Sequence, residues 1–293
     1  MRRGRHPGRD YAYRAGMTST DPSDGLSRYS HGHQPSVLAS HAARTAQNSC
    51  GYFLDRVQRG HRVLDLGCGP GSISLDLAQR VGPDGLVVGV DFSADAIAAA
   101  RAAAWARGDT TTRFVVGDLF DLDLEPGSFD IVHAHQVLQH LTDPVAALTA
   151  MARYSRPDGV IVARDADYGA MAWYPEPDGL DQWRDSYCAG ARSAGAEPYA
   201  GRRLRAWFHA AGLDIVAAGS STWTYATAEE TAWWGDSQAD RVLTSNFAAR
   251  AADQGLSQDE VAQIAADWRA WGRHPDAWFF LPHGEVVAVR RDR

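Results

Sequence analysis

The glycine-rich turn Gly67–Gly71, with the sequence GCGPG, constrains the fold more than any other part of the chain. The apolar run 63–66 before the turn predicts a buried strand, and residues 72–81 after it carry apolar side chains at helical spacing. Glycine suits such a turn because the chain bends sharply and a ligand can approach the backbone where a Cβ would stand in the way. A strand, a glycine turn and a helix in this order predict the first unit of an α/β sheet with a ligand at the strand's end.

The same alternation of strand and helix continues as far as residue 165. Strands joined by helices at this spacing form right-handed crossovers, which place helices on both faces of a parallel sheet. We therefore predict an open, doubly wound, Rossmann-like α/β fold with a mostly parallel seven-stranded sheet and helical cap insertions. The further strands are predicted over 86–90, 114–116, 129–133, 160–163, 214–220 and 284–290, and the helices over 94–107 and 144–154, with helical stretches near 29–59, 179–194, 200–211 and 227–273.

An acidic residue at the end of the second strand indicates what the glycine turn binds. Asp91 follows Gly71 by twenty residues, where a carboxylate can accept hydrogen bonds from both hydroxyls of a ribose. A dinucleotide site favours glycine at the position of Ser72, and the carboxylate of Asp65 would repel a pyrophosphate. The pattern therefore predicts a nucleoside ligand with a cationic group near the turn.

Five motifs in order resemble those of the class I S-adenosylmethionine-dependent methyltransferases, and the small-molecule enzymes with a UbiE-like core are the most similar. The motifs are VLDLGCGPGS (63–72), VVGVDFS (87–93), GDLFDL (117–122), FDIVHAHQVLQH (129–140) and RPDGVIVARD (156–165). The resemblance implies S-adenosylmethionine as cofactor and S-adenosylhomocysteine as product. It also extends into residues 29–48, which resemble the N-terminal helix of bacterial members.

The resemblance assigns a part of the cofactor to each motif. It places the glycines along the methionine moiety with Asp65 near the ammonium group, Asp91 on the ribose and Phe92 over the adenine. Asp118 and Leu119 would read the adenine. The full set expected to bind the cofactor is Asp65, Gly67, Cys68, Gly69, Gly71, Asp91, Phe92, Ser93, Gly117, Asp118, Leu119, His135 and Gln136.

The acceptor site is expected at the same edge of the sheet. A sulfonium methyl group is already activated, so the protein aligns the nucleophile and excludes water, and it needs a base only where the acceptor must lose a proton. The candidate catalytic residues are His135 and Tyr29, and the candidate pocket residues are Tyr29, His33, His140, Asp167, Tyr168, Trp173 and Tyr174. Structural alternatives stay open, because a histidine or a tryptophan at helical spacing is more often buried in a core.

The domain organisation follows from the motifs and from the tryptophans, nine of which lie after residue 170. We expect residues 1–25 to form a disordered basic tail and 26–60 a helical segment over the active site. Residues 61–165 would form the SAM-binding core. Residues 166–293 would complete the sheet and add a tryptophan-rich cap over about 166–212 and 224–278.

The composition of the chain excludes some kinds of partner and some kinds of chemistry. The charge is −7 and every basic side chain is Arg, so lysine chemistry is excluded and no basic stripe favours nucleic acid. Three cysteines favour a reducing cytoplasm, and no apolar run approaches the roughly 20 residues of a membrane span. The pairs His31/His33 and His133/His135 offer too few ligands for a metal site, and no metal is expected.

The function predicted from these observations is methyl transfer to a small organic acceptor, aromatic or hydrophobic, in specialised metabolism. Whether oxygen, nitrogen or carbon is methylated stays open, as does a homodimer. The alternatives are an NAD-dependent oxidoreductase and a non-catalytic protein that binds the same nucleoside.

Overall fold

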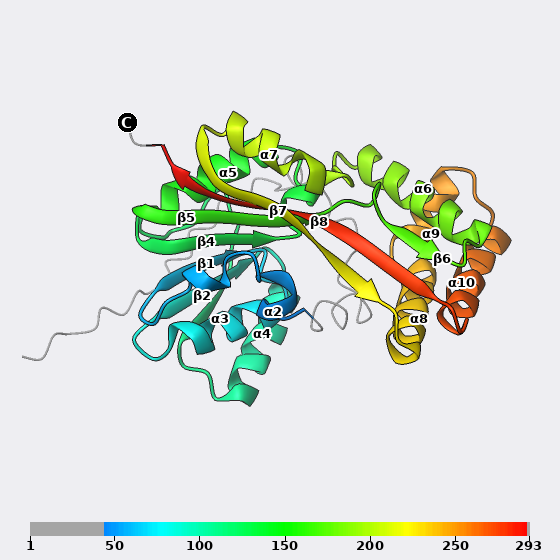
Figure 1. The fold of residues 1–293 in the computed structure, drawn as a ribbon, viewed down its shortest axis with the longest axis horizontal. Helices are drawn as coiled ribbons and strands as arrows, with labels where there is room; N and C mark the ends of the chain where they lie inside the picture. Colours follow the sequence, from blue (N-terminus) through cyan, green and yellow to red (C-terminus); the bar gives the residue numbers. More distant parts are fainter. Residues whose placement is uncertain (1–43, 292–293) are drawn as a thin grey trace, which may run out of the picture.

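The computed structural model describes residues 44–291, and its centre is one eight-stranded sheet (Figure 1). The strand order is β3-β2-β1-β4-β5-β8-β6, with β7 paired to β8. Strands β1 to β5 are parallel, whereas β8 runs antiparallel to β5, β6 and β7. The strands are β1 (Arg62–Leu66), β2 (Leu86–Asp91), β3 (Thr112–Val116), β4 (Phe129–His135), β5 (Ser155–Ala166), β6 (Ala172–Tyr174), β7 (Leu213–Tyr225) and β8 (Trp278–Arg290).

Helices that start at good capping residues cover the parallel part of the sheet. Ser93 and Asp143 accept hydrogen bonds from the backbone N–H groups of the first turn in the helices over 94–107 and 144–154. The α-helices are α2 (Ala46–Ser49), α3 (Ser72–Val81), α4 (Ala94–Arg107), α5 (Pro144–Tyr154), α6 (Asp178–Ser193), α7 (Ala200–Ala210), α8 (Ala228–Thr244), α9 (Phe247–Asp253) and α10 (Gln258–Gly272), and the 3₁₀ turns are η2 (Leu54–Arg56) and η3 (Leu138–His140).

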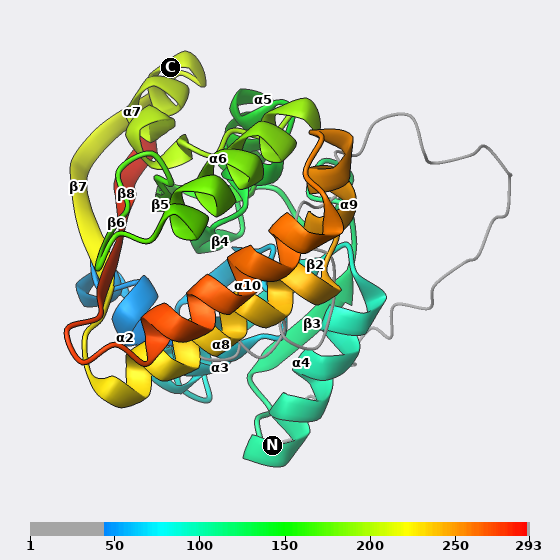
Figure 2. The ribbon, with the colours of Figure 1, turned by 90° about the vertical axis from the view of Figure 1, so that its right-hand side faces the viewer.

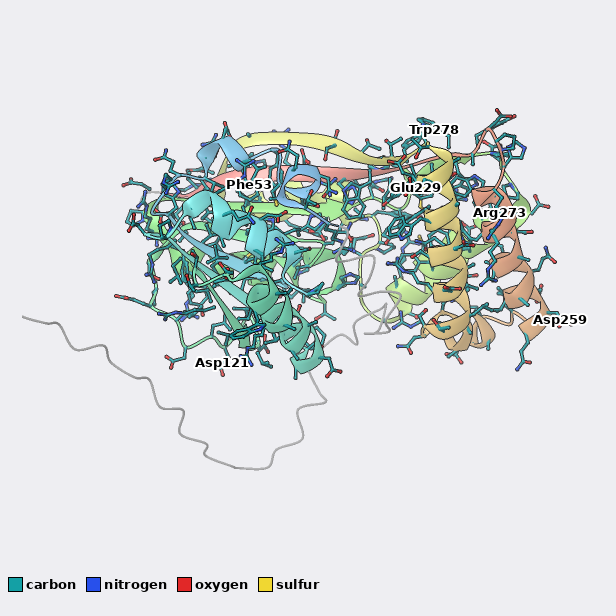
Figure 3. The ribbon with its side chains drawn as sticks, turned by 90° about the horizontal axis from the view of Figure 1, so that it is seen from below. Phe53, Asp121, Glu229, Asp259, Arg273 and Trp278 are labelled. Carbon is teal, nitrogen blue, oxygen red and sulfur yellow. The ribbon has the colours of Figure 1, made fainter. Side chains whose placement is uncertain are left out.

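The helices α6, α8, α9 and α10 form a separate group, which we call the cap. In Figure 1 the strands β7 and β8 run on beyond the parallel strands and end among these helices. Figure 2 shows α8 and α10 lying side by side, and Figure 3 places Glu229 and Arg273 at one end of this pair and Asp259 at the other. The two helices are therefore antiparallel.

The chain has separate hydrophobic cores for the sheet and the cap. One core packs α5 and α7 against the sheet with Leu64, Phe129 and Phe208, and a second covers the other face with Phe53 and Val87. The cap core contains most of the buried tryptophans, among them Trp183, Trp234, Trp268 and Trp271. Most of the tryptophan enrichment therefore serves packing in the cap.

The predicted α/β fold is confirmed, with differences at its edges. The helices predicted over 72–81, 94–107 and 144–154 agree with α3, α4 and α5. The sheet has eight strands rather than seven, because the short β6 pairs with β8 where the sequence predicts a loop. Residues 44–60 contain only α2 and η2, less helix than predicted. The expectations for residues 1–43 lie outside the described residues.

Candidate active site

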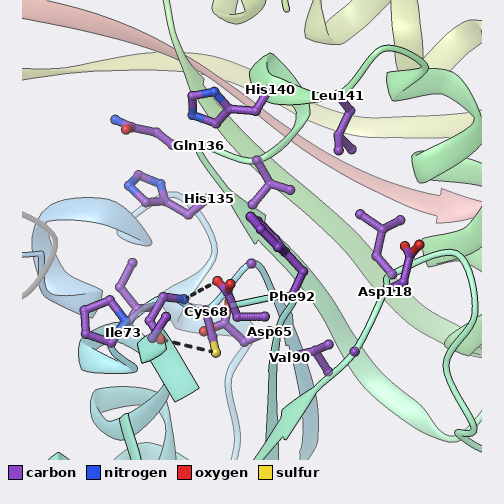
Figure 4. Close-up of a pocket in the computed structure, with 18 of the residues that line it drawn as sticks. Asp65, Cys68, Ile73, Val90, Phe92, Asp118, His135, Gln136, His140 and Leu141 are labelled. Atoms are coloured by element: carbon purple, nitrogen blue, oxygen red, sulfur yellow. Dashed lines mark hydrogen bonds between the residues drawn. The ribbon is translucent and has the colours of Figure 1, made fainter. Parts of the chain in front are cut away.

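A cavity lies at the carboxyl edge of the parallel strands, where the loops after β1, β2, β3 and β4 converge (Figure 4). Ligands bind at this edge in open α/β sheets, because the loops after neighbouring strands lead to opposite faces of the sheet and leave a crevice between them. The cavity is lined by Arg44, Asp65, Gly67, Cys68, Gly69, Pro70, Ser72, Ile73, Val90, Asp91, Phe92, Ala96, Gly117, Asp118, Leu119, Phe120, His135, Gln136, Val137, His140, Leu141 and Thr142.

The glycine turn forms the floor of the cavity. Gly67 has a φ of 68°, and a Cβ there would lie 2.3 Å from a methyl group of Val137, so only glycine fits. Gly71 differs from its predicted role. It begins α3 with a φ of 79°, and a Cβ there would lie 2.6 Å from the ring of Phe114, outside the cavity. Gly71 therefore permits close packing of α3 and does not line the ligand site.

Asp91 ties the end of β2 to the glycine turn. Its Oδ2 accepts a hydrogen bond from the N–H of Gly69 at 2.9 Å, and its Oδ1 accepts one from the N–H of Ser93 at 2.9 Å. Ser93 in turn accepts from the N–H of Ala96 and starts α4, so it supports the site from outside the cavity. The carboxylate is thus held in a fixed orientation at the cavity wall.

Apolar side chains of the cavity suit a flat ring. Phe92 is 52% exposed although it lines the cavity, and Leu119 lines the cavity as well. Asp118 accepts a hydrogen bond from the N–H of Phe120, which fixes its loop after β3. An exposed aromatic ring in the same cavity as a fixed carboxylate can stack on a base while polar atoms of the base meet Asp118.

Asp65 is buried and already paired. Its Oδ1 lies 2.8 Å from Nδ1 of His133, and its Oδ2 accepts a hydrogen bond from Ser74. Burial alone lowers the pKa of His133, but Cys50 and Asp65 beside it raise that pKa to about 10. The carboxylate therefore faces a protonated imidazole within the protein, which reduces its attraction for a ligand cation. The sequence argument treats His133 only as a metal ligand and misses this pair.

His135 is a buried polar residue of the cavity wall whose two ring nitrogens both lack a partner among the described residues. The side chain is 5% exposed, and neither ring nitrogen has a hydrogen-bond partner among residues 44–291. Burial, followed by the positive charges of Arg164 and Arg44, lowers the pKa of His135 well below its ordinary value. The imidazole is therefore neutral near pH 7, and its unprotonated nitrogen can accept a hydrogen bond from a ligand.

Gln136, which follows His135 at the end of β4, has an unusual backbone conformation. Its φ is 53°, a left-handed backbone conformation that a residue other than glycine seldom adopts. Its side-chain oxygen accepts a hydrogen bond from Arg44 at 2.9 Å, and its amide nitrogen lies 2.7 Å from Nε2 of His283. His283 also lies 2.9 Å from the carbonyl of Leu281 through Nδ1, so it donates there and accepts from Gln136. The backbone N–H of Gln136 also donates to the carbonyl of Arg164 at 2.7 Å, so three hydrogen bonds hold the strained residue.

The predicted acceptor residues are only partly brought together. His140 lines the cavity and lies 3.0 Å from the side-chain nitrogen of Gln139, and burial, with Arg44 and Arg250, lowers its pKa to about 3. Asp167 instead forms an ion pair with Arg202. Tyr29 and His33 lie outside the described residues.

The aromatic residues predicted after β5 lie away from the cavity. Tyr168 is buried in the cap core against Tyr187, and Trp173 stacks on Phe279 at 6.2 Å because β6 pairs with β8. Tyr174 is 58% exposed. They do not line this cavity because the chain turns outward after β5 to form β6, and their assignment to the acceptor pocket stays a prediction.

The structure adds residues that the sequence argument does not select. Arg44 lines the cavity, and Trp223 of β7 lies 5.7 Å from the ring of His135. His283 of β8 stacks on His135 at 6.2 Å and lies 4.5 Å from the ring of Trp223, so the three rings form one cluster. No motif marks these positions, because β7 and β8 approach β4 only after the antiparallel strands join the sheet.

Two searches within the described part of the chain gave no further site. Residues 44–291 contain no group of three or more His, Cys, Asp or Glu side chains placed to hold a metal ion. Over the same range, the helices are too short or too polar to cross a bilayer.

Comparison with known proteins agrees with the geometry. The sequence model of a family described as "Methyltransferase domain" matches residues 58–234. An uncharacterized methyltransferase of Schizosaccharomyces pombe is 33% identical over 281 residues, covering 92% of this chain and 99% of the relative. The nocamycin O-methyltransferase of Saccharothrix syringae is 40% identical over 102 residues, 35% of this chain and 36% of that protein.

A solved structure shares the fold at low sequence identity. It is the Haemonchus contortus phospholethanolamine N-methyltransferase 2, in complex with phosphomonomethylethanolamine and S-adenosylhomocysteine. The TM-score is 0.52 at 17% identity, over 84% of this chain and 52% of the other. The likeness supports the arrangement of the fold.

Proposed function

Because the chain belongs to the S-adenosylmethionine-dependent methyltransferases, we propose that it methylates a small organic acceptor with His135 as the general base. The observation that carries the proposal is the neutral, unsatisfied imidazole of His135 in the cavity wall. The family membership excludes the oxidoreductase alternative.

The cavity residues fit the cofactor. S-adenosylmethionine supplies a methyl group activated by a sulfonium. The fixed carboxylate of Asp91 would accept hydrogen bonds from the ribose hydroxyls, and Phe92 with Leu119 would enclose the adenine. The backbone of Gly67 and Gly69 would pass along the methionine part, where no side chain intervenes. This arrangement directs the reactive end toward His135.

The transfer requires a deprotonated acceptor atom when the acceptor is a hydroxyl group. That atom forms a bond to the methyl carbon, the carbon–sulfur bond breaks with its electron pair left on sulfur, and the acceptor's proton moves to His135. The positive charges of Arg164 and Arg44 keep the imidazole neutral beforehand. Burial excludes water from the reacting atoms, which favours the aligned nucleophile over hydrolysis.

The proposal also covers the chemical class of the acceptor and the location of the protein in the cell. The motif similarity to nocamycin O-methyltransferase supports a specialised metabolite as acceptor, and the unsatisfied base supports transfer to an ionisable hydroxyl group. A cytoplasmic location is consistent with the three free cysteines. The cap over residues 178–272 would close the acceptor side of the cavity.

The experiment has two stages. Calorimetric titration with S-adenosylmethionine, S-adenosylhomocysteine and NAD should give micromolar binding of the first two only. A panel of phenols, enols, carboxylic acids and amines is then tested for release of S-adenosylhomocysteine. The best hydroxyl acceptor is used to compare wild type with His135→Ala and with His209→Ala, which alters an exposed histidine on α7.

The His135→Ala variant should bind the cofactor normally but turn over about 10²–10⁴-fold more slowly near pH 7. Its rate should rise with pH as the acceptor ionises without help, while the wild-type rate stays nearly flat. The His209→Ala variant should match wild type. Equal turnover of wild type and His135→Ala would remove His135 as the base.

A further inference from the structure

We propose that the acceptor is an organic anion, whose charge is recognised by Arg44 and Arg241 and whose flat body lies along Trp223 and Tyr225. The inference rests on the proposed function, because it describes the acceptor side of the same cavity. It is carried by the position of the two arginines along one face of β7.

Arg44 brings a positive charge to the cavity beside the proposed base. It is the one arginine lining this cavity within residues 44–291. Its guanidinium lies 5.4 Å from the ring centre of Trp223, and it donates to the side-chain oxygen of Gln136 at 2.9 Å. A guanidinium held by an aromatic face and an amide is pre-oriented, so it loses little freedom when it binds an anion.

The indole of Trp223 connects Arg44 to the base. Its ring centre lies 5.7 Å from that of His135 and 4.5 Å from that of His283. The guanidinium of Arg164, a buried residue of β5, lies 5.1 Å from the centre of the Trp223 ring. Glu285 and Ser221 bind this guanidinium. The indole therefore lies among cationic groups, next to the cavity residues His135 and Arg44.

The second arginine lies further along β7, toward the cap. Tyr225 is two residues after Trp223, so the two side chains share one face of the strand. The Tyr225 ring stacks on Trp234 of α8 at 4.5 Å, and the guanidinium of Arg241 lies 5.9 Å from the Trp234 ring. The face thus leads from His135 to a second positive charge on the cap.

The charges around this route favour an anion. Burial raises the pKa of Tyr225 to about 12; the charge of Glu230 acts in the same direction, and the charges of Arg44 and Arg241 lower it. Arg44 and Arg250 act in the same way on His140. The carboxylates of the cavity, Asp65, Asp91 and Asp118, belong instead to the loops that hold the cofactor.

The test uses two probes of the same shape and different charge, 2-naphthoate and 2-naphthamide. Each is titrated into the full-length protein saturated with S-adenosylhomocysteine, and binding is followed by calorimetry. Wild type should bind the carboxylate about tenfold or more tightly than the amide, since a guanidinium–carboxylate contact is a strong charge-assisted hydrogen bond. The matched variants are Arg44→Gln, Arg241→Gln and, as control, Arg205→Gln, an exposed arginine on α7.

Arg44→Gln and Arg241→Gln should each reduce the preference for the carboxylate by at least about threefold, and the control should keep it. Equal binding of the two probes, a carboxylate affinity weaker than millimolar, or an unchanged preference in both variants would overturn the proposal. Failure of the proposed function has a different signature, namely normal turnover in His135→Ala. The cofactor affinity of each variant, measured in the same titrations, separates misfolding from a lost anion site.

Discussion

At the scale of single residues, some side chains of the site hold the protein backbone in place and are also positioned to bind the ligand. Asp91 accepts backbone hydrogen bonds from Gly69 and Ser93, and those bonds orient the same carboxylate toward the cavity. Asp65 differs from Asp91, because its two oxygens are bound by the side chains of His133 and Ser74. A motif identifies each acid but does not indicate which of them remains available to a ligand.

Asp91→Ala should weaken binding of S-adenosylhomocysteine by about 1.5–3 kcal/mol, because charge-assisted hydrogen bonds to the ribose are lost. Part of that loss comes from the glycine turn, which also loses the acceptor for the Gly69 N–H. Asp91→Asn keeps one oxygen and should fall between wild type and the alanine variant. Calorimetric titration measures all three, and an unchanged affinity in Asp91→Ala would remove the ribose assignment.

At the scale of elements, the end of β5 holds the loop that forms the wall beyond β4. Asp165 accepts a hydrogen bond from the N–H of Gln139, and the side-chain oxygen of Gln139 accepts one from the N–H of Ala166. The other oxygen of Asp165 is buried and has no partner among residues 44–291. Burial raises the pKa of Asp165 to about 7, so the folded protein holds this proton far more tightly than the unfolded chain does.

Asp165→Asn should therefore stabilise the fold at high pH. As pH rises from about 4 to 7, the unfolded chain loses this proton before the folded protein does, so wild-type stability falls over that window. Asparagine resembles the protonated acid, and the variant should gain about 1–3 kcal/mol at pH 8 and nothing near pH 4. Urea unfolding at both values checks this, with the exposed Asp158→Asn as control. A variant that is less stable at pH 8 would contradict the argument.

The same scale shows what the sequence could and could not predict. The parallel core was predictable because each strand and helix carries its own local pattern, from the apolar run before Gly67 to the Ser93 cap. The part of β8 that precedes Gly284 could not be predicted from the sequence, because Pro282 lacks an N–H and usually marks the end of a strand. In the structure, the carbonyl of Pro282 accepts a hydrogen bond from the N–H of Asp167, and β8 continues to Trp278.

The long strands β7 and β8 also explain why the sequence analysis did not select Trp223 and His283. The cofactor side follows from motifs that are local in sequence, and eleven of the thirteen predicted cofactor residues line the cavity, Gly71 and Ser93 excepted. The acceptor side depends on contacts between distant segments, such as Trp223 with His135. Long-range pairing of this kind leaves no periodic signal in a single sequence.

At the scale of the whole molecule, the sheet with its cores and the cap with its own core are joined by a pair of long strands. The cavity is lined by residues 44–142, which belong to the sheet, whereas the cap core is built around tryptophans and Phe279. The strands β7 and β8 pair along almost their whole length and connect the two parts. Cofactor binding and cap stability should therefore be separable.

Trp268→Ala tests this separation. The side chain is fully buried, with its ring centre 5.0 Å from that of Trp183, 5.7 Å from Trp271 and 6.0 Å from Phe279. Truncation should lower the free energy of unfolding by about 3–5 kcal/mol, because it leaves a large cavity in the cap. Trp105→Ala, which alters an 88% exposed side chain on α4, should change stability by less than about 0.5 kcal/mol.

Affinity for S-adenosylhomocysteine should stay within about threefold of wild type in Trp268→Ala, while turnover of an accepted substrate falls because the acceptor side loses its support. Thermal unfolding and calorimetric titration on the same preparations measure the two effects. If cofactor affinity fell together with the stability of the cap, the sheet and the cap would form one cooperative unit. Binding on the sheet would then depend on the cap as much as methyl transfer does.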